Sequence, residues 1–172
     1  MVGRWRHRAV DHLSPRARGA CYHWHLMAIN TDVIGKTYPA MTYAVGREKI
    51  REYALAVGET QPLYLDLEAA REAGYDDLVA PPMFAVVYGL PAVAVALFDP
   101  EVGADFSRLV HGGQEFAWGP LVVAGDEITT TVTVADISER AGNGFFVFES
   151  VSDNQHGETV CTGRWSNIVR AA

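Results

Sequence analysis

The chain has 172 residues, of which 49% are hydrophobic and 20% are charged, a composition typical of one globular domain rather than a disordered chain. Its formal net charge of −7 argues against nucleic-acid binding by the chain as a whole. The two cysteines, Cys21 and Cys161, have no CxxC or paired spacing, which excludes a disulfide scaffold. This cysteine usage favours a reducing compartment, so we expect a cytoplasmic protein.

Residues 1–26 differ in composition from the rest of the chain. They hold five Arg and one Asp, whereas the other residues hold nine Lys or Arg and twenty Asp or Glu. They lack the continuous apolar stretch of a secretory signal, and their single Ser and four His are atypical of a transit peptide. We expect an extension outside the fold, either disordered or misassigned, with residues 27–172 as a single domain. Cys21, His23 and His25 are too tightly spaced to predict a zinc site.

The first part of the domain combines a β-prone segment with helical patterns. Residues 35–45 are β-prone. Residues 47–57 carry apolar side chains at i, i+3, i+4 and i+7, which predicts an amphipathic helix that Gly58 ends in the left-handed conformation. Residues 60–66 are then expected as a loop, and residues 67–73 as a short helix.

Residues 78–98 form a stretch without any charged side chain that is long enough to suggest a membrane span. However, this stretch contains Pro81, Pro82 and Pro91, and its flanks are acidic, with no basic anchor on either side. A helix that is apolar on every face and begins at a proline is more typical of a buried core helix. We therefore expect a core helix over residues 82–97 and no membrane association.

The last third of the chain has the period of two that is typical of strands. Residues 128–135 alternate strictly, and residues 145–151 and 159–169 are further strand candidates separated by Gly-containing turns. One apolar helix and a run of antiparallel strands predict an α+β domain in which a sheet wraps around the helix, the hot-dog architecture. Because such a sheet leaves an exposed edge, we expect two sheets to pair into a dimer.

The order of these segments resembles the MaoC-like (R)-hydratase/dehydratase group, and more narrowly its FAS1-like dehydratase N-terminal type, which includes HadA- and HadC-type subunits. The resemblance covers about residues 34–170. It is carried by GREKIREYA (46–54), LVAPPMF (78–84) and HGGQEF (111–116), followed by Pro120 and Gly125-Asp126. It implies reversible dehydration of a (3R)-3-hydroxyacyl thioester, on acyl carrier protein or coenzyme A, to the trans-2-enoyl thioester. This reaction implies no cofactor and no metal.

The residues that match the family's catalytic motif are altered. Active members carry D-x-N-P-x-H, whose Asp and His hold a water and transfer protons. The matching residues of this chain run from Glu59 to Tyr64. Glu59 keeps the carboxylate but moves it by roughly an ångström, which can cost about a hundredfold in a positioned site. Tyr64 replaces the His, and its unperturbed pKa of ~10 makes it a poor proton shuttle near neutrality.

The family's oxyanion donor is altered as well. Active members polarise the thioester carbonyl with a backbone N–H at the start of the core helix, and the matching residue here, Pro82, has no N–H. The resemblance therefore implies that a D-x-N-P-x-H partner of the HadB type supplies the chemistry. This chain would shape the acyl pocket, with Pro82, Met83 and Val86 of the core helix and Gly112 and Gln114 as substrate-binding candidates.

Other interpretations remain at this stage. His111 is a further catalytic candidate, because the glycines that follow it would let a thioester arm approach closely. The cations of residues 47–51 are either a solvated helix face or a landing place for an acidic carrier protein or a coenzyme A phosphate. Two alternative functions are a hot-dog thioester hydrolase, in which Glu59 activates water, and a non-catalytic homodimer that binds acyl thioesters.

Overall fold

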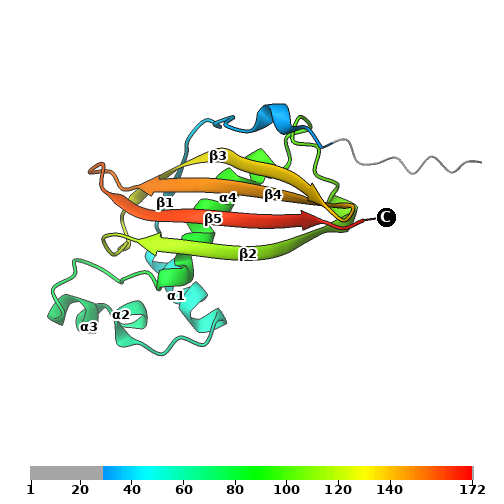
Figure 1. Ribbon diagram of the computed structural model, residues 1–172. Coiled ribbons are helices and arrows are strands. Elements are labelled where there is room, and N and C mark those ends of the chain that lie inside the picture. Colours follow the sequence, from blue (N-terminus) through cyan, green and yellow to red (C-terminus); the bar gives the residue numbers. More distant parts are fainter. Residues whose placement is uncertain (1–28, 172) are drawn as a thin grey trace, which may run out of the picture.

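The structure is a computed structural model that describes residues 29–171 (Figure 1). Five antiparallel strands form one sheet in the order β1-β3-β4-β5-β2. The strands are β1 (Met41–Ala44), β2 (Leu109–Trp118), β3 (Glu127–Arg140), β4 (Asn143–Asp153) and β5 (Thr159–Val169). The expected extension over residues 1–26, with its Cys and His residues, lies outside the described part of the chain.

The alternation of residues 128–135 places one row of β3 side chains in the core. Ile128, Val132 and Val134 are buried, and their neighbours in the chain are only partly covered. Thr130 is the polar member of this row, and its hydroxyl forms a 2.8 Å hydrogen bond with the hydroxyl of Ser152 on β4. The pattern predicted this strand because the sheet buries one face against a helix and leaves the other exposed.

The sheet wraps around α4 (Ala85–Leu97), which the 3-10 turn Pro82–Phe84 precedes. The helix lies very close to the sheet at Gly89, where a Cβ would stand 3.2 Å from the Trp165 ring. The hot-dog fold is confirmed, and the expected helix start at Pro82 is corrected to a 3-10 turn. Two prolines and no side-chain cap at this point favour the tighter turn.

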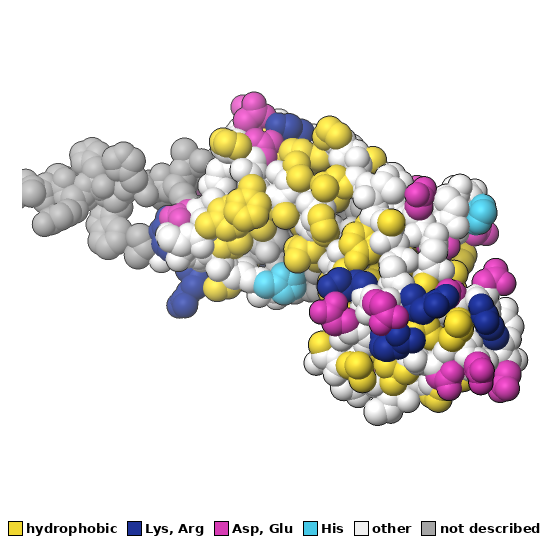
Figure 2. Space-filling view, turned by 180° about the vertical axis from the view of Figure 1, so that it is seen from behind, with side chains coloured by type: hydrophobic (Ala, Val, Ile, Leu, Met, Phe, Trp, Pro, Cys, Tyr) yellow, Lys and Arg dark blue, Asp and Glu magenta, His cyan; other side chains and the backbone are white. Residues whose placement is uncertain are grey.

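α4 is the expected core helix, since Ala92, Val93 and Ala96 are buried, but one of its sides is exposed. Leu90 and Val95 are about half exposed, and Phe98, just after the helix, is 63% exposed. Figure 2 shows hydrophobic side chains gathered on the side of the molecule where α4 lies. Within residues 29–171, no helix combines the length and apolar character needed to cross a membrane. The sheet covers only one side of the helix, and no other layer among residues 29–171 covers the opposite side.

Three helices form a small unit beside one end of the sheet (Figure 1): α1 (Arg47–Ala56), α2 (Pro62–Leu65) and α3 (Leu67–Glu72). The interpretation of residues 60–66 as a loop missed α2, a single turn that begins at Pro62. The side chain of Asp66 then caps α3, accepting from the N–H groups of Glu68 and Ala69. The expected end of α1 is confirmed, since Gly58 has a φ of 77°.

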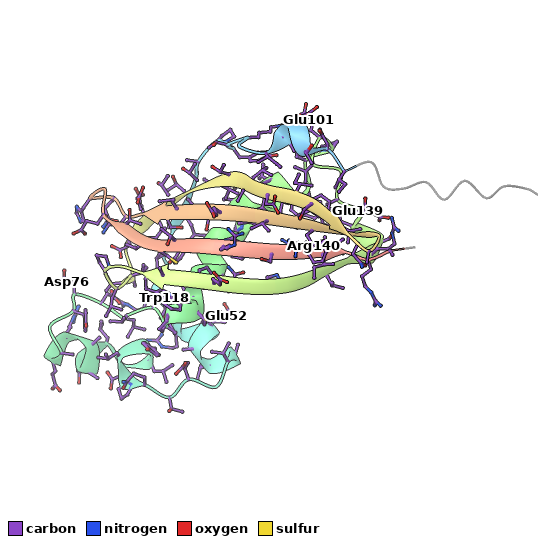
Figure 3. All side chains as sticks on the ribbon, in the orientation of Figure 1. Glu52, Asp76, Glu101, Trp118, Glu139 and Arg140 are labelled. Carbon is purple, nitrogen blue, oxygen red and sulfur yellow. The ribbon has the colours of Figure 1, made fainter. Side chains whose placement is uncertain are left out.

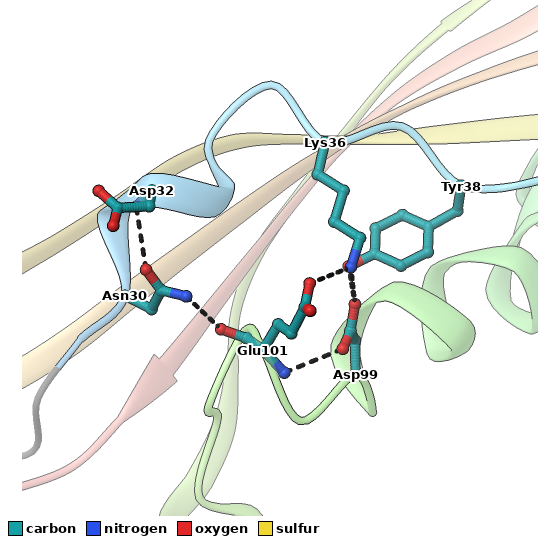
Figure 4. Close-up of polar contacts among 6 residues, drawn as sticks. All are labelled: Asn30, Asp32, Lys36, Tyr38, Asp99 and Glu101. Carbon is teal, nitrogen blue, oxygen red and sulfur yellow. Dashed lines mark hydrogen bonds and ion pairs between the residues drawn. The ribbon is translucent and has the colours of Figure 1, made fainter.

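A polar cluster ties the segment before β1 to the loop after α4 (Figure 4). Lys36 Nζ lies 2.6 Å from Asp99 Oδ2 and also bonds the carboxylate of Glu101. The hydroxyl of the buried Tyr38 donates to Asp99 at 2.7 Å. These contacts hold the pKa of Asp99 at about 2, first through the Lys36 hydrogen bond and then through Tyr38. The cluster holds the C-terminal end of α4 against the segment that precedes β1.

Candidate functional site

An apolar cavity of about 420 Å³ lies at the start of α4. Its walls come from three separate stretches of chain: the turn into α4, the segment after β2 and the start of β5. The lining residues are Ala80, Pro81, Pro82, Phe84, Ala85, Tyr88, Trp118, Gly119, Pro120, Leu121, Val122 and Val160. Almost every lining side chain is apolar, so the cavity suits a hydrocarbon chain rather than a charged ligand.

Two aromatic side chains hold the turn at the mouth of this cavity. The indole Nε1 of Trp118 donates to the carbonyl oxygen of Pro82 at 2.9 Å. The hydroxyl of Tyr53 donates to the carbonyl oxygen of Met83 at 3.1 Å. Figure 3 shows Trp118 at the junction between the sheet and the small helical unit. Sequence reasoning missed both residues, because neither contact follows from local periodicity.

Gly119 lets the segment after β2 turn tightly against β5. Its N–H donates to the carbonyl oxygen of Val160 at 2.9 Å, and a Cβ at this position would stand 2.1 Å from the carbonyl oxygen of Thr159. That distance is a severe clash, so only glycine fits here. In the sequence, only the Trp118-Gly119-Pro120 motif could have indicated that this segment forms a wall of the cavity.

Glu59 lies beside the same turn, and neither Glu59 nor Tyr64 lines the apolar cavity. Glu59 is exposed and lines a second cavity of about 330 Å³ with Tyr53, Pro82 and Met83 among its neighbours. Burial, and secondly the negative charge of Glu59, raise the pKa of the partly buried Tyr64. Tyr64 therefore stays protonated near neutral pH and is an even weaker proton shuttle than a free tyrosine.

Pro82 lines both cavities and begins the turn into α4. Because Pro81 and Pro82 lack an N–H, the first backbone donor that this turn presents belongs to Met83. The structure thus brings three predicted residues, Glu59, Pro82 and Met83, to one cavity, and Tyr64 lies close enough to Glu59 for its pKa to respond to that charge. Val86 does not line the apolar cavity and packs instead against the core cluster around Trp165.

The remaining predicted residues lie on β2, which the sequence analysis did not identify as a strand. His111 is exposed and stands seven residues from Trp118, about 23 Å along an extended strand. Gly112 is the extra residue of a β-bulge, and a Cβ there would meet Ile168 at 2.9 Å. Gln114 donates from Nε2 to the carbonyl oxygen of Arg164 at 3.3 Å. Packing within the sheet thus accounts for Gly112, so it gives no support for approach of a thioester arm.

The cations of α1 are paired with acids of α1 itself or of the loop that follows α3. Arg47 bonds Asp77, Lys49 pairs with Glu52 at 2.8 Å, and Arg51 bonds Glu48. Figure 2 shows acidic and basic side chains interleaved over this part of the surface. The arrangement supports the interpretation as a solvated, paired helix face and not a basic landing place.

A five-stranded sheet around one helix, with an apolar cavity at the helix start, places the chain among hot-dog domains. The chain belongs to the FAS1-like, dehydratase domain region family, whose model matches residues 32–163. A UPF0336 protein of Saccharopolyspora erythraea is 45% identical over 145 residues, covering 84% of this chain and 93% of that protein. A UPF0336 protein of Clavibacter michiganensis is also 45% identical, covering 84% and 97%.

Solved structures show the same fold. A chain of the HadBC (3R-hydroxyacyl-ACP dehydratase) complex from Mycobacterium tuberculosis has a TM-score of 0.70 and 31% identity, covering 81% of this chain and 99% of that one. A MaoC-like dehydratase has a TM-score of 0.69 and 30% identity, covering 86% of this chain and 44% of that one. The ChsH1–ChsH2 complex from Mycobacterium tuberculosis, at 21% identity and a TM-score of 0.60, covers 79% of this chain and 89% of that one and shows the fold alone.

Proposed function

We propose that this chain is a subunit of a (3R)-3-hydroxyacyl-thioester dehydratase, acting on acyl carrier protein or coenzyme A thioesters. Its cavity holds the acyl group, and a partner chain with D-x-N-P-x-H carries the acid and base. One observation carries the proposal: an apolar cavity opens at the start of α4, beside a site in which Glu59, Tyr64 and Pro82 replace the family's three catalytic groups.

The reaction removes a proton from C2 of the acyl group and the hydroxyl from C3, which leaves as water once it is protonated. One group must accept the first proton and another must deliver the second, and a donor must stabilise the charge on the thioester oxygen. The raised pKa of Tyr64 and the missing N–H of Pro82 leave this chain poorly equipped for those steps. A partner with the intact motif supplies them, and no cofactor is needed for the proton transfers.

The surface suited to the partner combines β2 and the exposed side of α4. β2 is an edge strand, so its outward backbone groups lack a partner strand within the described chain. Exposed apolar side chains stand on α4 at Leu90 and Val95, and at the end of β2 at Trp118. Pairing of β2 with the corresponding strand of a second chain would extend the sheet and cover this apolar surface.

The purified chain should show little or no hydration of crotonyl-CoA or longer enoyl-CoAs by itself. Addition of a D-x-N-P-x-H partner encoded in a neighbouring reading frame should produce turnover in the ordinary enzymatic range, ~1–10³ s⁻¹. The measurement is loss of enoyl absorbance. Rapid hydration by the chain alone would contradict the assignment of the chemistry to the partner.

A substitution at the rim of the cavity tests whether this subunit holds the acyl chain. Leu121→Trp, at a half-exposed lining position, should lower kcat/KM for long enoyl thioesters about tenfold or more and spare crotonyl-CoA, because overfilling a pocket costs ~1–3 kcal/mol. Leu55→Trp, at an exposed position of α1, is the matched control. Equal losses on short and long substrates would exclude the acyl-pocket role.

The same assays separate the alternatives. Glu59 faces a cavity beside Pro82, so a thioester hydrolase would release free thiol without a partner, and Glu59→Gln would abolish that release. A non-catalytic homodimer would bind long-chain thioesters but support neither reaction with any partner. Free-thiol release by the chain alone would replace our proposal with the hydrolase.

A further inference from the structure

The apolar cavity ends one helical turn along α4, where the indole of Trp165 on β5 fills the space between the helix and the sheet. Ala85 and Tyr88 are the last residues of α4 that line the cavity, and Gly89 follows them. A Cβ at Gly89 would stand 3.2 Å from the Trp165 ring, so the helix and the ring are in direct contact. Trp165 does not line the cavity and is only 4% exposed. The indole therefore occupies the space directly beyond the cavity.

Contacts with three neighbours on the sheet hold the indole in place. Its Nε1 donates to the buried Ser150 Oγ on β4 at 2.9 Å, and the Phe116 ring on β2 meets it edge to face at a centroid distance of 5.4 Å. On β5, a Cβ at Gly163 would stand 2.8 Å from the indole Nε1, so the ring fits over the strand only because this residue is glycine. A hydrogen-bonded ring in a close-packed core does not move aside easily, so it forms a rigid barrier.

The helix by itself would not close the cavity at this point. The residues of α4 that follow Ala85 on its buried side are small on each turn: Gly89, Ala92 and Ala96. Small side chains leave room beside a helix unless a neighbouring element fills it. The ring of Trp165 fills it at Gly89, the nearest of these positions to the cavity. The identity of residue 165 therefore decides how far the cavity extends along α4.

We propose that Trp165 limits the length of the acyl chain that this subunit accepts, and that its substrates are medium-chain acyl thioesters. This inference rests on the proposed function, because it assumes that an acyl group enters beside Pro82. From Pro82 to Gly89, the 3-10 turn and the first turn of α4 advance by about 12 Å, at ~2.0 Å and ~1.5 Å per residue. An extended hydrocarbon with bonds of ~1.5 Å advances by roughly 1.3 Å per carbon, so about nine carbons fit between the entry and the indole.

Binding of saturated acyl-CoA esters, which have no double bond to hydrate, tests the inference without turnover. In titration calorimetry of the full chain, affinity should rise from butanoyl-CoA to decanoyl-CoA, and tetradecanoyl-CoA should bind no more tightly than decanoyl-CoA. Trp165→Leu should bind tetradecanoyl-CoA about tenfold more tightly than wild type, because further CH₂ groups leave water. Trp165→Phe, which keeps most of the packing, should gain about threefold for dodecanoyl-CoA. Phe146→Leu, a buried position that does not line the cavity, is the matched control and should bind the series as wild type does.

Wild-type affinity that keeps rising through tetradecanoyl-CoA would overturn the chain-length limit, and so would absence of binding by every ester. Folded Trp165→Leu and Trp165→Phe chains, checked by circular dichroism, that bind the series as wild type does would also overturn it. An equal gain in Phe146→Leu would assign the effect to loosening of the core and not to Trp165. Absence of hydration by the wild-type chain with its partner would refute the proposed function, while the acyl-CoA binding profile would still decide the limit.

Discussion

At the residue scale, Pro82 changes both the chemistry and the geometry of the site. It has no N–H to offer a thioester oxygen, and its carbonyl oxygen is held by the indole of Trp118. Tyr53 holds the next carbonyl in the same way. The turn into α4 is therefore fixed by two side chains from distant parts of the chain, which suits a wall of a binding cavity better than a catalytic donor.

Asp99 should contribute stability that depends on pH. Its folded pKa of about 2 lies below the ordinary value of 3.8, so the contribution is present above about pH 4 and is lost as the pH falls toward 2. Asp99→Asn should lower the melting temperature by about 3–6 °C at pH 7, and the difference from wild type should shrink below pH 4. Thermal unfolding followed by circular dichroism at several pH values measures this difference.

Glu52→Gln is the control for that experiment. Glu52 pairs with Lys49 on the surface, with 70% of its side chain exposed against 13% for Asp99. Exposed ion pairs contribute little because water and salt screen them. The control should unfold within about 1 °C of wild type at every pH. An Asp99→Asn difference that is constant from pH 2 to pH 7 would show that ionisation of Asp99 is not its source.

At the element scale, the exposed side of α4 and the free edge of β2 predict where subunits meet. Leu90 is about half exposed in the middle of α4, so a charged side chain there should not unfold the single chain. The same charge would be costly to bury in an apolar interface between subunits. Leu90→Glu should convert the dimer that we propose to monomer at micromolar concentration. Sedimentation velocity gives the assembly state, and circular dichroism gives the fold.

Leu55→Glu on α1 is the matched control, since Leu55 is 63% exposed and lies outside this surface. It should leave the dimer intact. A Leu90→Glu chain that remains dimeric would exclude α4 from the interface, and a chain that loses its circular dichroism spectrum would show that Leu90 is needed within the fold itself.

At the scale of the whole molecule, the described contacts begin at residue 29. Ile29 packs against the core and Asn30 donates from Nδ2 to the carbonyl oxygen of Glu101 at 3.0 Å. Deletion of residues 1–26 removes none of these contacts. It should leave the melting temperature within about 1–2 °C of the full chain. A fall of several degrees in a thermal melt would mean that residues 1–26 stabilise the domain.

Local sequence was sufficient for most elements of the fold. The period of β3 and that of α1 report which side chains meet the core, and Gly58 marks a helix end because its φ is positive. β2 escaped detection because Gly112 and Gly113 interrupt its pattern, and the bulge at Gly112 shifts the side chains from one face to the other. The small helix α2 is a single turn, too short to show a period.

The sequence alone determined the family and the α+β class, because both depend on residue identity and nearby spacing. It also predicts altered catalytic positions at Glu59, Tyr64 and Pro82. Only the tertiary structure decided which side of α4 is left uncovered, because a helix that is apolar all round carries no pattern to show it. It also decided the cavity, whose walls at Pro82, Trp118 and Val160 meet only after the sheet forms. Contacts between distant segments depend on strand order and register, and local periodicity does not encode either.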